Sequence, residues 1–271
     1  MVEPSIRAGR EEALFVRSVR SVGRWWEVWA EHAGQIGLLV WATFVALVRM
    51  RISLKEFIRQ LYVMGAQSIP IVFVTALLSG IVTSQQGGYQ ITSTIPIYVL
   101  GSVTVTSIVL ELAPVLTAIV LVGRVGARIT AELGTMVVSE QIDAYHSLGR
   151  DPLVVLAAPR ILAGLIVMPA LVGFSNLAGI GSGMVAANLS VGLSAETFLY
   201  GARLFWHSWD LFYSFMKSVT FGFAIPVIAI HMGLRTSGGA AGVGSTTTAS
   251  VMFQTLTVLI LDALFPPLFL Q

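Results

Sequence analysis

The composition of this 271-residue chain is that of a membrane protein, with 55% hydrophobic and only 11% charged residues. Soluble domains average about 25% charged residues. The stretch from Gln60 to Leu110 contains no charged residue, and one soluble core could not bury so much apolar sequence. The absence of cysteine excludes disulfides and thiolate metal sites. The net charge of +2 is distributed as membrane topology requires, so we expect no nucleic-acid partner.

Residues 1–60 are predicted to form a cytoplasmic and interfacial region. Apolar side chains recur there at the spacing of one helical face, namely Phe15, Val19, Val22, Trp26 and Trp29. Arginines occupy another face, which predicts an amphipathic helix lying in the membrane interface; an ordinary cytosolic helix is the alternative. Gly34–Val48 is apolar but only 15 residues long and has basic flanks, which favours a short re-entrant helix.

Residues 61–271 are predicted to form a transmembrane domain. Five uncharged or nearly uncharged stretches are long enough to span a bilayer, namely Leu61–Ser84, Ile97–Val122, Val154–Ala186, Leu211–Leu234 and Thr248–Leu270. The polar Gln85–Gly88 is expected to form the turn between the first two. Alternating the spans from a cytoplasmic N-terminus leaves only Arg203 and Lys217, among the basic residues, on the exported side.

The predicted cytoplasmic loop, residues 123–153, is rich in charged residues. Within it Ser139–Leu148 favours a short helix that ends before Pro152. Glu140 and Asp143 would share one face of this helix, while Ile142 and Tyr145 lie on another. Such a ridge docks into a groove on a partner protein or packs against its own bundle, and the pattern leaves both open.

Two carboxylates lie inside predicted spans. Glu111 is close to the middle of its span and Asp262 lies in the last one. Intramembrane carboxylates usually face a wet cavity or join a polar network. We interpret Glu111 as lining a cavity, with a protonated, hydrogen-bonded carboxyl as the alternative, and we assign Asp262 the structural role.

Gln85, Gln86 and Tyr89, at the exported end of the first predicted hairpin, are candidates for the mouth of that cavity or for contact with a partner; an ordinary polar loop is the alternative. A channel, a secondary transporter or an intramembrane hydrolase using Ser182 are rival functions. No histidine pair has metal-binding spacing and no base is placed to activate Ser182. We therefore expect no catalytic residue and no metal site in this chain.

Four runs in the middle of the chain identify a family resemblance: ELAPVLTA, GRVGARITAELGTM, EQIDAY and GRDPL. They resemble the MlaE or YrbE permeases of Mce-type ABC transporters. The residues of the second run that make up the expected cytoplasmic loop motif are Gly123, Arg124, Gly126, Arg128, Glu132 and Gly134. Family members often have a basic residue where this chain has Leu110, so a local charge pair with Glu111 is not expected.

The resemblance implies a homodimeric, multi-pass permease in a bacterial inner membrane that moves phospholipids or related lipids. Its expected partners are a separate, MlaF-like ABC ATPase on the cytoplasmic side and an MlaD-like Mce-domain protein on the exported side. The segment that matches the family's coupling helix is Glu140, Gln141, Ile142, Asp143, Ala144 and Tyr145. This chain has no phosphate-binding glycine loop, so ATP and Mg²⁺ are expected on the ATPase and no cofactor on the permease.

Overall fold

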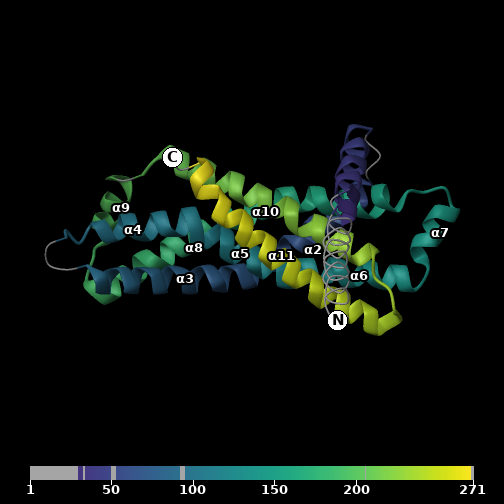
Figure 1. Ribbon diagram of the computed structural model, residues 1–271. Coiled ribbons are helices and arrows are strands. Elements are labelled where there is room, and N and C mark those ends of the chain that lie inside the picture. Colours follow the sequence, from purple (N-terminus) through teal and green to yellow (C-terminus); the bar gives the residue numbers. More distant parts are fainter. Residues whose placement is uncertain (1–29, 33, 50–52, 92–94, 205, 270–271) are drawn as a thin grey trace, which may run out of the picture.

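The protein, described here by a computed structural model, is a bundle of long helices (Figure 1). The structure describes residues 30–32, 34–49, 53–91, 95–204 and 206–269. All the regular elements in these ranges are helical, which confirms the predicted all-α integral membrane fold. The interfacial helix predicted around Trp26 and Trp29 lies outside the described residues and stays a prediction.

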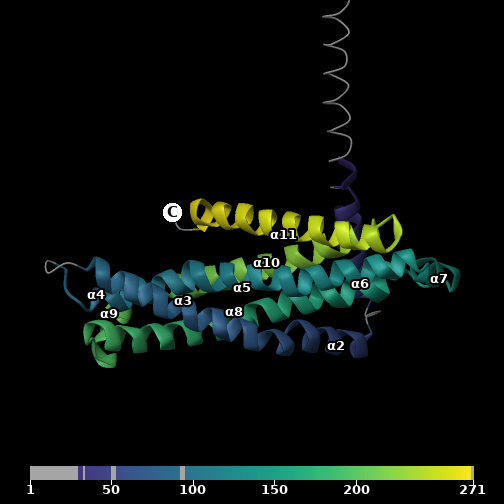
Figure 2. The ribbon, with the colours of Figure 1, turned by 90° about the horizontal axis from the view of Figure 1, so that it is seen from below.

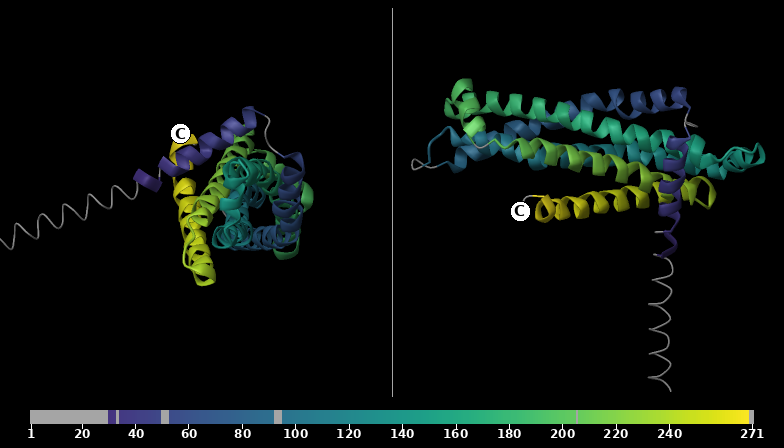
Figure 3. Two further views of the ribbon diagram at one scale, coloured as in Figure 1. Left: turned by 90° about the vertical axis from the view of Figure 1, so that its right-hand side faces the viewer. Right: turned by 90° about the horizontal axis from the view of Figure 1, so that it is seen from above.

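Six described helices are long and apolar enough to cross a membrane, against five predicted spans. They are Ala30–Val48, Leu54–Gln90, Val99–Val138, Leu153–Val191, Ser208–Leu234 and Gly239–Phe269. The last five run along the bundle, whereas Ala30–Val48 lies across it in every view (Figures 1 and 3). A helix in that orientation lies along a membrane surface when the bundle spans the membrane.

The re-entrant path predicted for Gly34–Val48 is wrong. These residues continue as one helix from Ala30, because the run from Leu38 to Val48 contains no proline or glycine that could reverse the chain. Side chains at its beginning tie the helix to the end of α10 (Ser208–Leu234): Arg235 Nη1 lies 3.0 Å from Glu31 Oε1, and the rings of His32 and His231 are joined by a 2.7 Å hydrogen bond.

Helix α3 (Ile69–Gln90) follows α2 (Leu54–Met64) and the 3₁₀ turn η1 (Ala66–Ser68). The turn predicted at Gln85–Gly88 is therefore wrong, since these residues are helical. A Cβ at Gly87 would lie 2.7 Å from Leu100, and one at Gly88 would lie 3.1 Å from Val191. The two glycines thus permit close helix packing, which in membrane helices is as common a use of glycine as a turn.

The helix Val99–Val138 is assembled from five segments. They are α4 (Val99–Ser107), the π turn η2 (Ile108–Leu112), α5 (Ala113–Leu121), the π turn η3 (Val122–Gly126) and α6 (Ala127–Val138). In each π turn the closing N–H bonds to the carbonyl five residues earlier, one residue more than in an α-helix.

The prediction of a loop over residues 123–153 is therefore wrong for most of the segment, which is helical. Residues up to Val138 continue the preceding span, because Ile129 and Leu133 are buried in the core while charged Arg128 is exposed. The connection proper contains the short helix α7 (Gln141–Ser147) and leads into the π turn η4 (Leu153–Ala157). This connection lies at the opposite end of the bundle from α9 (Ala195–Leu204) (Figures 1 and 2).

Helix α8 (Ala158–Val191) is at the centre of the packing and contacts α2, α3 and α10. Small residues allow the close approach: Gly80 of α3 faces Gly179, and Gly164 faces Gly222 of α10. Helix α11 (Gly239–Phe269) closes the bundle against α6 and α10 (Figure 2). Close backbone packing of this kind is the main source of helix association in membranes.

Candidate functional site: an ion-pair cluster inside the bundle

Three helices bring together charged residues that lie inside their spans. Lys217 Nζ of α10 lies 2.6 Å from Glu111 Oε2 of η2 and 2.5 Å from Asp262 Oδ1 of α11. Lys217 also sits 5.4 Å from the centre of the Tyr213 ring, within the range of a cation–π contact. We call Glu111, Lys217 and Asp262 the central charge cluster.

The position of Lys217 corrects the sequence-based assignment of this residue to the exported side. Its side chain is fully buried in the bundle. Burying an ammonium group in a low-dielectric interior is costly unless it is paired and hydrogen-bonded. Glu111 therefore does have a basic partner, supplied by α10 rather than by the neighbouring position Leu110.

Pro114 explains how the main chain contributes to the cluster. In an uninterrupted α-helix the carbonyl of Leu110 would accept the N–H of residue 114, but proline has none. The freed Leu110 carbonyl instead accepts a 3.2 Å hydrogen bond from Lys217 Nζ. The π turn Ile108–Leu112 accommodates the proline and presents both the carbonyl and the Glu111 side chain to Lys217.

The three side chains of the cluster differ in exposure. The side chain of Glu111 is 48% exposed, that of Asp262 15% and that of Lys217 0%. With both carboxyls ionised the cluster carries one net negative charge. The excess carboxylate thus lies at the surface of the single chain, inside the candidate span Val99–Val138.

A second set of ion pairs lies at the α7 end of the bundle. Arg160, whose side chain is 1% exposed, donates a 2.9 Å hydrogen bond to Glu132 Oε1 and a 2.6 Å hydrogen bond to the Leu156 carbonyl. Arg59 of α2 lies 3.9 Å from the same Glu132 oxygen. Glu132 of the GRVGARITAELGTM run therefore joins α2, α6 and α8.

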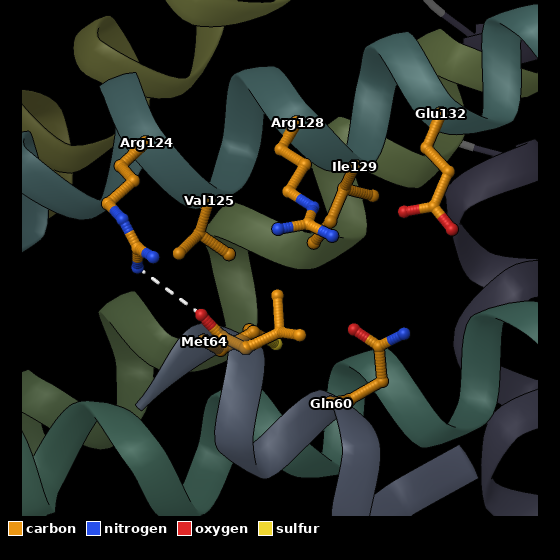
Figure 4. Close-up of a pocket in the computed structure, with 8 residues that line it drawn as sticks. Gln60, Met64, Arg124, Val125, Arg128, Ile129 and Glu132 are labelled. Carbon is orange, nitrogen blue, oxygen red and sulfur yellow. Dashed lines mark hydrogen bonds between the residues drawn. The ribbon is translucent and has the colours of Figure 1, made fainter. Parts of the chain in front are cut away.

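The other residues of that run have separate places. Arg124 donates to the Val63 carbonyl and to the side chains of Gln67 and Ser68, while Arg128 is exposed; both line a pocket with Glu132 (Figure 4). Gly126 and Gly134 face Gln254 and Thr236 closely enough that a Cβ would collide with them. Gly123 has open space around it.

Helix α7 has one inward and one outward side. Ile142 and Tyr145 are half-buried and pack against the main core, so part of the predicted ridge rests on its own bundle. The exposed positions of the segment are Glu140, Gln141, Asp143 and Ala144. Glu140 adopts a left-handed conformation at φ 58° immediately before the helix, a strained position for a residue with a side chain.

Gln85, Gln86 and Tyr89 lie on the last turns of α3 and are all exposed, Tyr89 by 92%. In the described part of the chain no hydrogen bond or ion pair joins them to the central charge cluster. The structure thus places these candidates at the opposite end of the bundle from α7 rather than beside Glu111 (Figure 1).

Ser182, the residue of the hydrolase alternative, makes a helix contact. Its hydroxyl donates to the carbonyls of Leu77 and Gly179, both at 3.0 Å. His231 pairs with His32 instead. A nucleophilic serine needs a base within hydrogen-bond reach, and no histidine of the described residues is bonded to Ser182.

Sequence reasoning found both acids of the central charge cluster but missed Lys217. A usable signal was present, because Glu111, Lys217 and Asp262 lie in the interiors of three different hydrophobic helices. Ionisable groups within membrane helices pair with one another. Because Lys217 was interpreted as marking the exported side of the membrane, its pairing with Glu111 and Asp262 was not predicted.

Comparison with known proteins places the chain in a family. The family model described as Permease MlaE matches residues 57–267. A probable ABC transporter permease protein of Synechocystis sp. is 35% identical over 238 residues, which cover 86% of this chain and 89% of that protein.

Two further relatives extend the comparison. A probable ABC transporter permease protein of Rickettsia felis is 31% identical, with 95% of this chain and all of that protein covered. The chloroplastic protein trigalactosyldiacylglycerol 1 of Arabidopsis thaliana is 31% identical over 88% of this chain and 66% of its own length. The chain therefore belongs to the MlaE family of ABC transporter permeases, which are transporter subunits rather than catalytic enzymes.

Proposed function

We propose that this permease moves phospholipids or related lipids between a bacterial inner membrane and an Mce-domain partner. The observation that carries the proposal is the half-exposed carboxylate of Glu111 inside the candidate span Val99–Val138. A carboxylate facing hydrocarbon is strongly disfavoured, so Glu111 must face a wet cavity or another protein surface. A cavity lined by a fixed charge suits an amphiphilic cargo with a polar headgroup.

A second copy of the chain would complete this cavity. One bundle buries Lys217 fully yet leaves Glu111 open, so the cluster presents its polar edge outward. In a homodimer the two Glu111 carboxylates would face one shared space, enclosed by apolar helix surfaces. The name of the Arabidopsis relative refers to a glycolipid, which is consistent with a lipid cargo.

The energy source in this proposal is a separate ATPase that holds ATP and Mg²⁺. Its docking site would be the exposed side of α7, with Glu140, Gln141, Asp143 and Ala144 at the contact. Ile142 and Tyr145 would transmit the movement, because they pack against the core of the bundle. Gln85, Gln86 and Tyr89, at the other end, would face the Mce partner, and the N-terminus would be cytoplasmic.

The test is lipid transfer by the complex of permease, ATPase and Mce-domain protein reconstituted in liposomes. Glu111→Gln keeps the shape of the side chain and removes its charge, and we expect it to lower ATP-driven transfer about tenfold, the effect of losing one charged interaction. Glu196→Gln, at an exposed carboxylate of α9, is the matched control.

Wild-type transfer by Glu111→Gln would refute the role of the cavity. Transfer that persists in proteoliposomes without any ATPase would refute the ABC mechanism and favour a channel or secondary transporter. Loss in both Glu111→Gln and Glu196→Gln would point to a general effect of charge and would likewise count against the proposed site.

A further inference from the structure

A small pocket lies between α2 and the η3–α6 part of the long helix, well away from Glu111 along the same helix. It has a volume of about 60 Å³. Its walls combine apolar side chains with the polar side chains of Gln60, Arg124, Arg128 and Glu132. Figure 4 shows the guanidinium groups of Arg124 and Arg128 extending from their helix toward α2.

The two arginines are four residues apart, so they share one face of the helix and repel each other. Arg124 is held in place by neutral acceptors only: the Val63 carbonyl and Gln67 Oε1, each at 3.2 Å, and the Ser68 hydroxyl. These contacts orient the guanidinium without compensating its charge. No described residue forms an ion pair or a hydrogen bond with the Arg128 guanidinium.

Glu132, the acidic side chain that lines the pocket, already forms ion pairs with other arginines. Glu132 pairs with Arg160 at 2.9 Å and lies 3.9 Å from Arg59, while Glu56 pairs with Arg59 at 3.3 Å. This region thus contains four arginines but only two glutamates: Arg59, Arg124, Arg128 and Arg160, with Glu56 and Glu132. The positive excess lies on Arg124 and Arg128, which face the pocket.

The outer side of α2 indicates what surrounds the pocket. Leu54, Ile58 and Tyr62 follow one another at four-residue spacing and are 68%, 56% and 60% exposed. They form an apolar stripe on the outer face of α2, at the start of the candidate span Leu54–Gln90, as expected where a helix enters the membrane interface. A tyrosine at the end of such a stripe is typical of headgroup depth.

We propose that this pocket binds an anionic phosphate group through Arg124 and Arg128. Arginine presents several N–H donors in a plane and pairs strongly with phosphate oxygens. The apolar stripe of α2 favours the headgroup phosphate of an anionic lipid over a free phosphate in solution. The site is distinct from the proposed cargo cavity at Glu111, and binding at it requires neither the ATPase nor transport.

The experiment measures lipid retention by the purified full-length protein in detergent, by native mass spectrometry. Phosphatidylglycerol and phosphatidylcholine of identical acyl chains are added in equal amounts. The wild type is expected to retain the anionic lipid preferentially. Arg128→Gln is expected to lower this preference about tenfold, since hydrogen bonds to charged groups contribute that much.

Arg150→Gln removes an exposed arginine from the α7–α8 connection, outside the pocket, and serves as the matched control. It should retain phosphatidylglycerol as the wild type does. Arg128→Lys keeps the charge but not the planar donors of arginine. Its preference for phosphatidylglycerol over phosphatidylcholine should lie between those of the wild type and Arg128→Gln.

Competition with inorganic phosphate shows whether the pocket binds the phosphate of a lipid headgroup or free phosphate from solution. Displacement of lipid by millimolar phosphate in the wild type, but not of the residual lipid in Arg128→Gln, would support a phosphate site open to soluble anions. Retention unaffected by phosphate and lost in Arg128→Gln would support the lipid headgroup. No preference for the anionic lipid in the wild type, or equal losses in Arg128→Gln and Arg150→Gln, would overturn the proposal.

Discussion

The central charge cluster and the Glu132–Arg160 pair each neutralise a buried cation, but with opposite charge in excess. Each buries a cation almost completely, Lys217 in one and Arg160 in the other. The central cation is shared by two carboxylates, so negative charge is in excess and reaches the surface at Glu111. At the α7 end the acid is shared by two arginines, Arg160 and Arg59. Both clusters therefore join three helices, but the central one leaves a carboxylate at the surface of the bundle, whereas the other has an excess of positive charge.

Removing the shared cation should produce the largest loss of stability. Lys217→Met leaves Glu111 and Asp262 close together with no counter-charge, and we expect a loss of roughly 3–5 kcal/mol, as for other broken buried pairs. Thermal unfolding in detergent, followed by circular dichroism, measures it. The triple variant Lys217→Met, Glu111→Gln, Asp262→Asn should recover most of the loss. An unchanged melting temperature in Lys217→Met would contradict the pairing.

Removing the cation of the second pair should cost less. Arg160→Met leaves Glu132 with Arg59 3.9 Å away and with solvent, because the Glu132 side chain is 32% exposed. We expect a loss of about 2 kcal/mol, in the range for a hydrogen-bonded group deprived of its partner. The same unfolding assay compares the two variants. A loss larger than that of Lys217→Met would reverse the distinction between the two clusters.

Substitutions on α7 should leave both clusters intact. Glu140→Lys with Asp143→Lys changes exposed side chains only, so we expect stability within about 0.5 kcal/mol of the wild type. ATP hydrolysis by the reconstituted complex should then no longer drive lipid transfer, if α7 is the docking helix. The control Glu196→Lys reverses an exposed charge at the other end of the bundle. Normal coupling in the α7 variant would remove α7 from the proposed mechanism.

The sequence predicted the helical fold and both intramembrane acids because these depend on composition and on single residues. It did not predict which helices meet. Lys217 was misassigned because a basic residue is interpreted as a topology marker until its partner on another helix is known. Gln85–Gly88 was taken for a turn because glycine breaks helices in water, whereas here Gly87 and Gly88 make room for Leu100 and Val191.

The continuation of helix through residues 123–138 was also missed. Charge density suggested a loop, yet the charged side chains of this segment lie at its surface and in ion pairs while Ile129 and Leu133 enter the core. Periodicity over the whole segment carried that information. The orientation of Ala30–Val48 across the bundle could not be derived, because it depends on contacts such as that of Glu31 with Arg235, far apart in the sequence.

The π turns of the long helix Val99–Val138 determine the direction in which its side chains point. Each turn holds one residue more than an α-helical turn, and one residue corresponds to about 100° of rotation around the axis. The rod therefore consists of three sections with different angular registers, joined at Ile108–Leu112 and Val122–Gly126. Glu111 lies in the first of these π turns and Arg124 in the second. The direction of each side chain around the helix axis therefore depends on its own π turn.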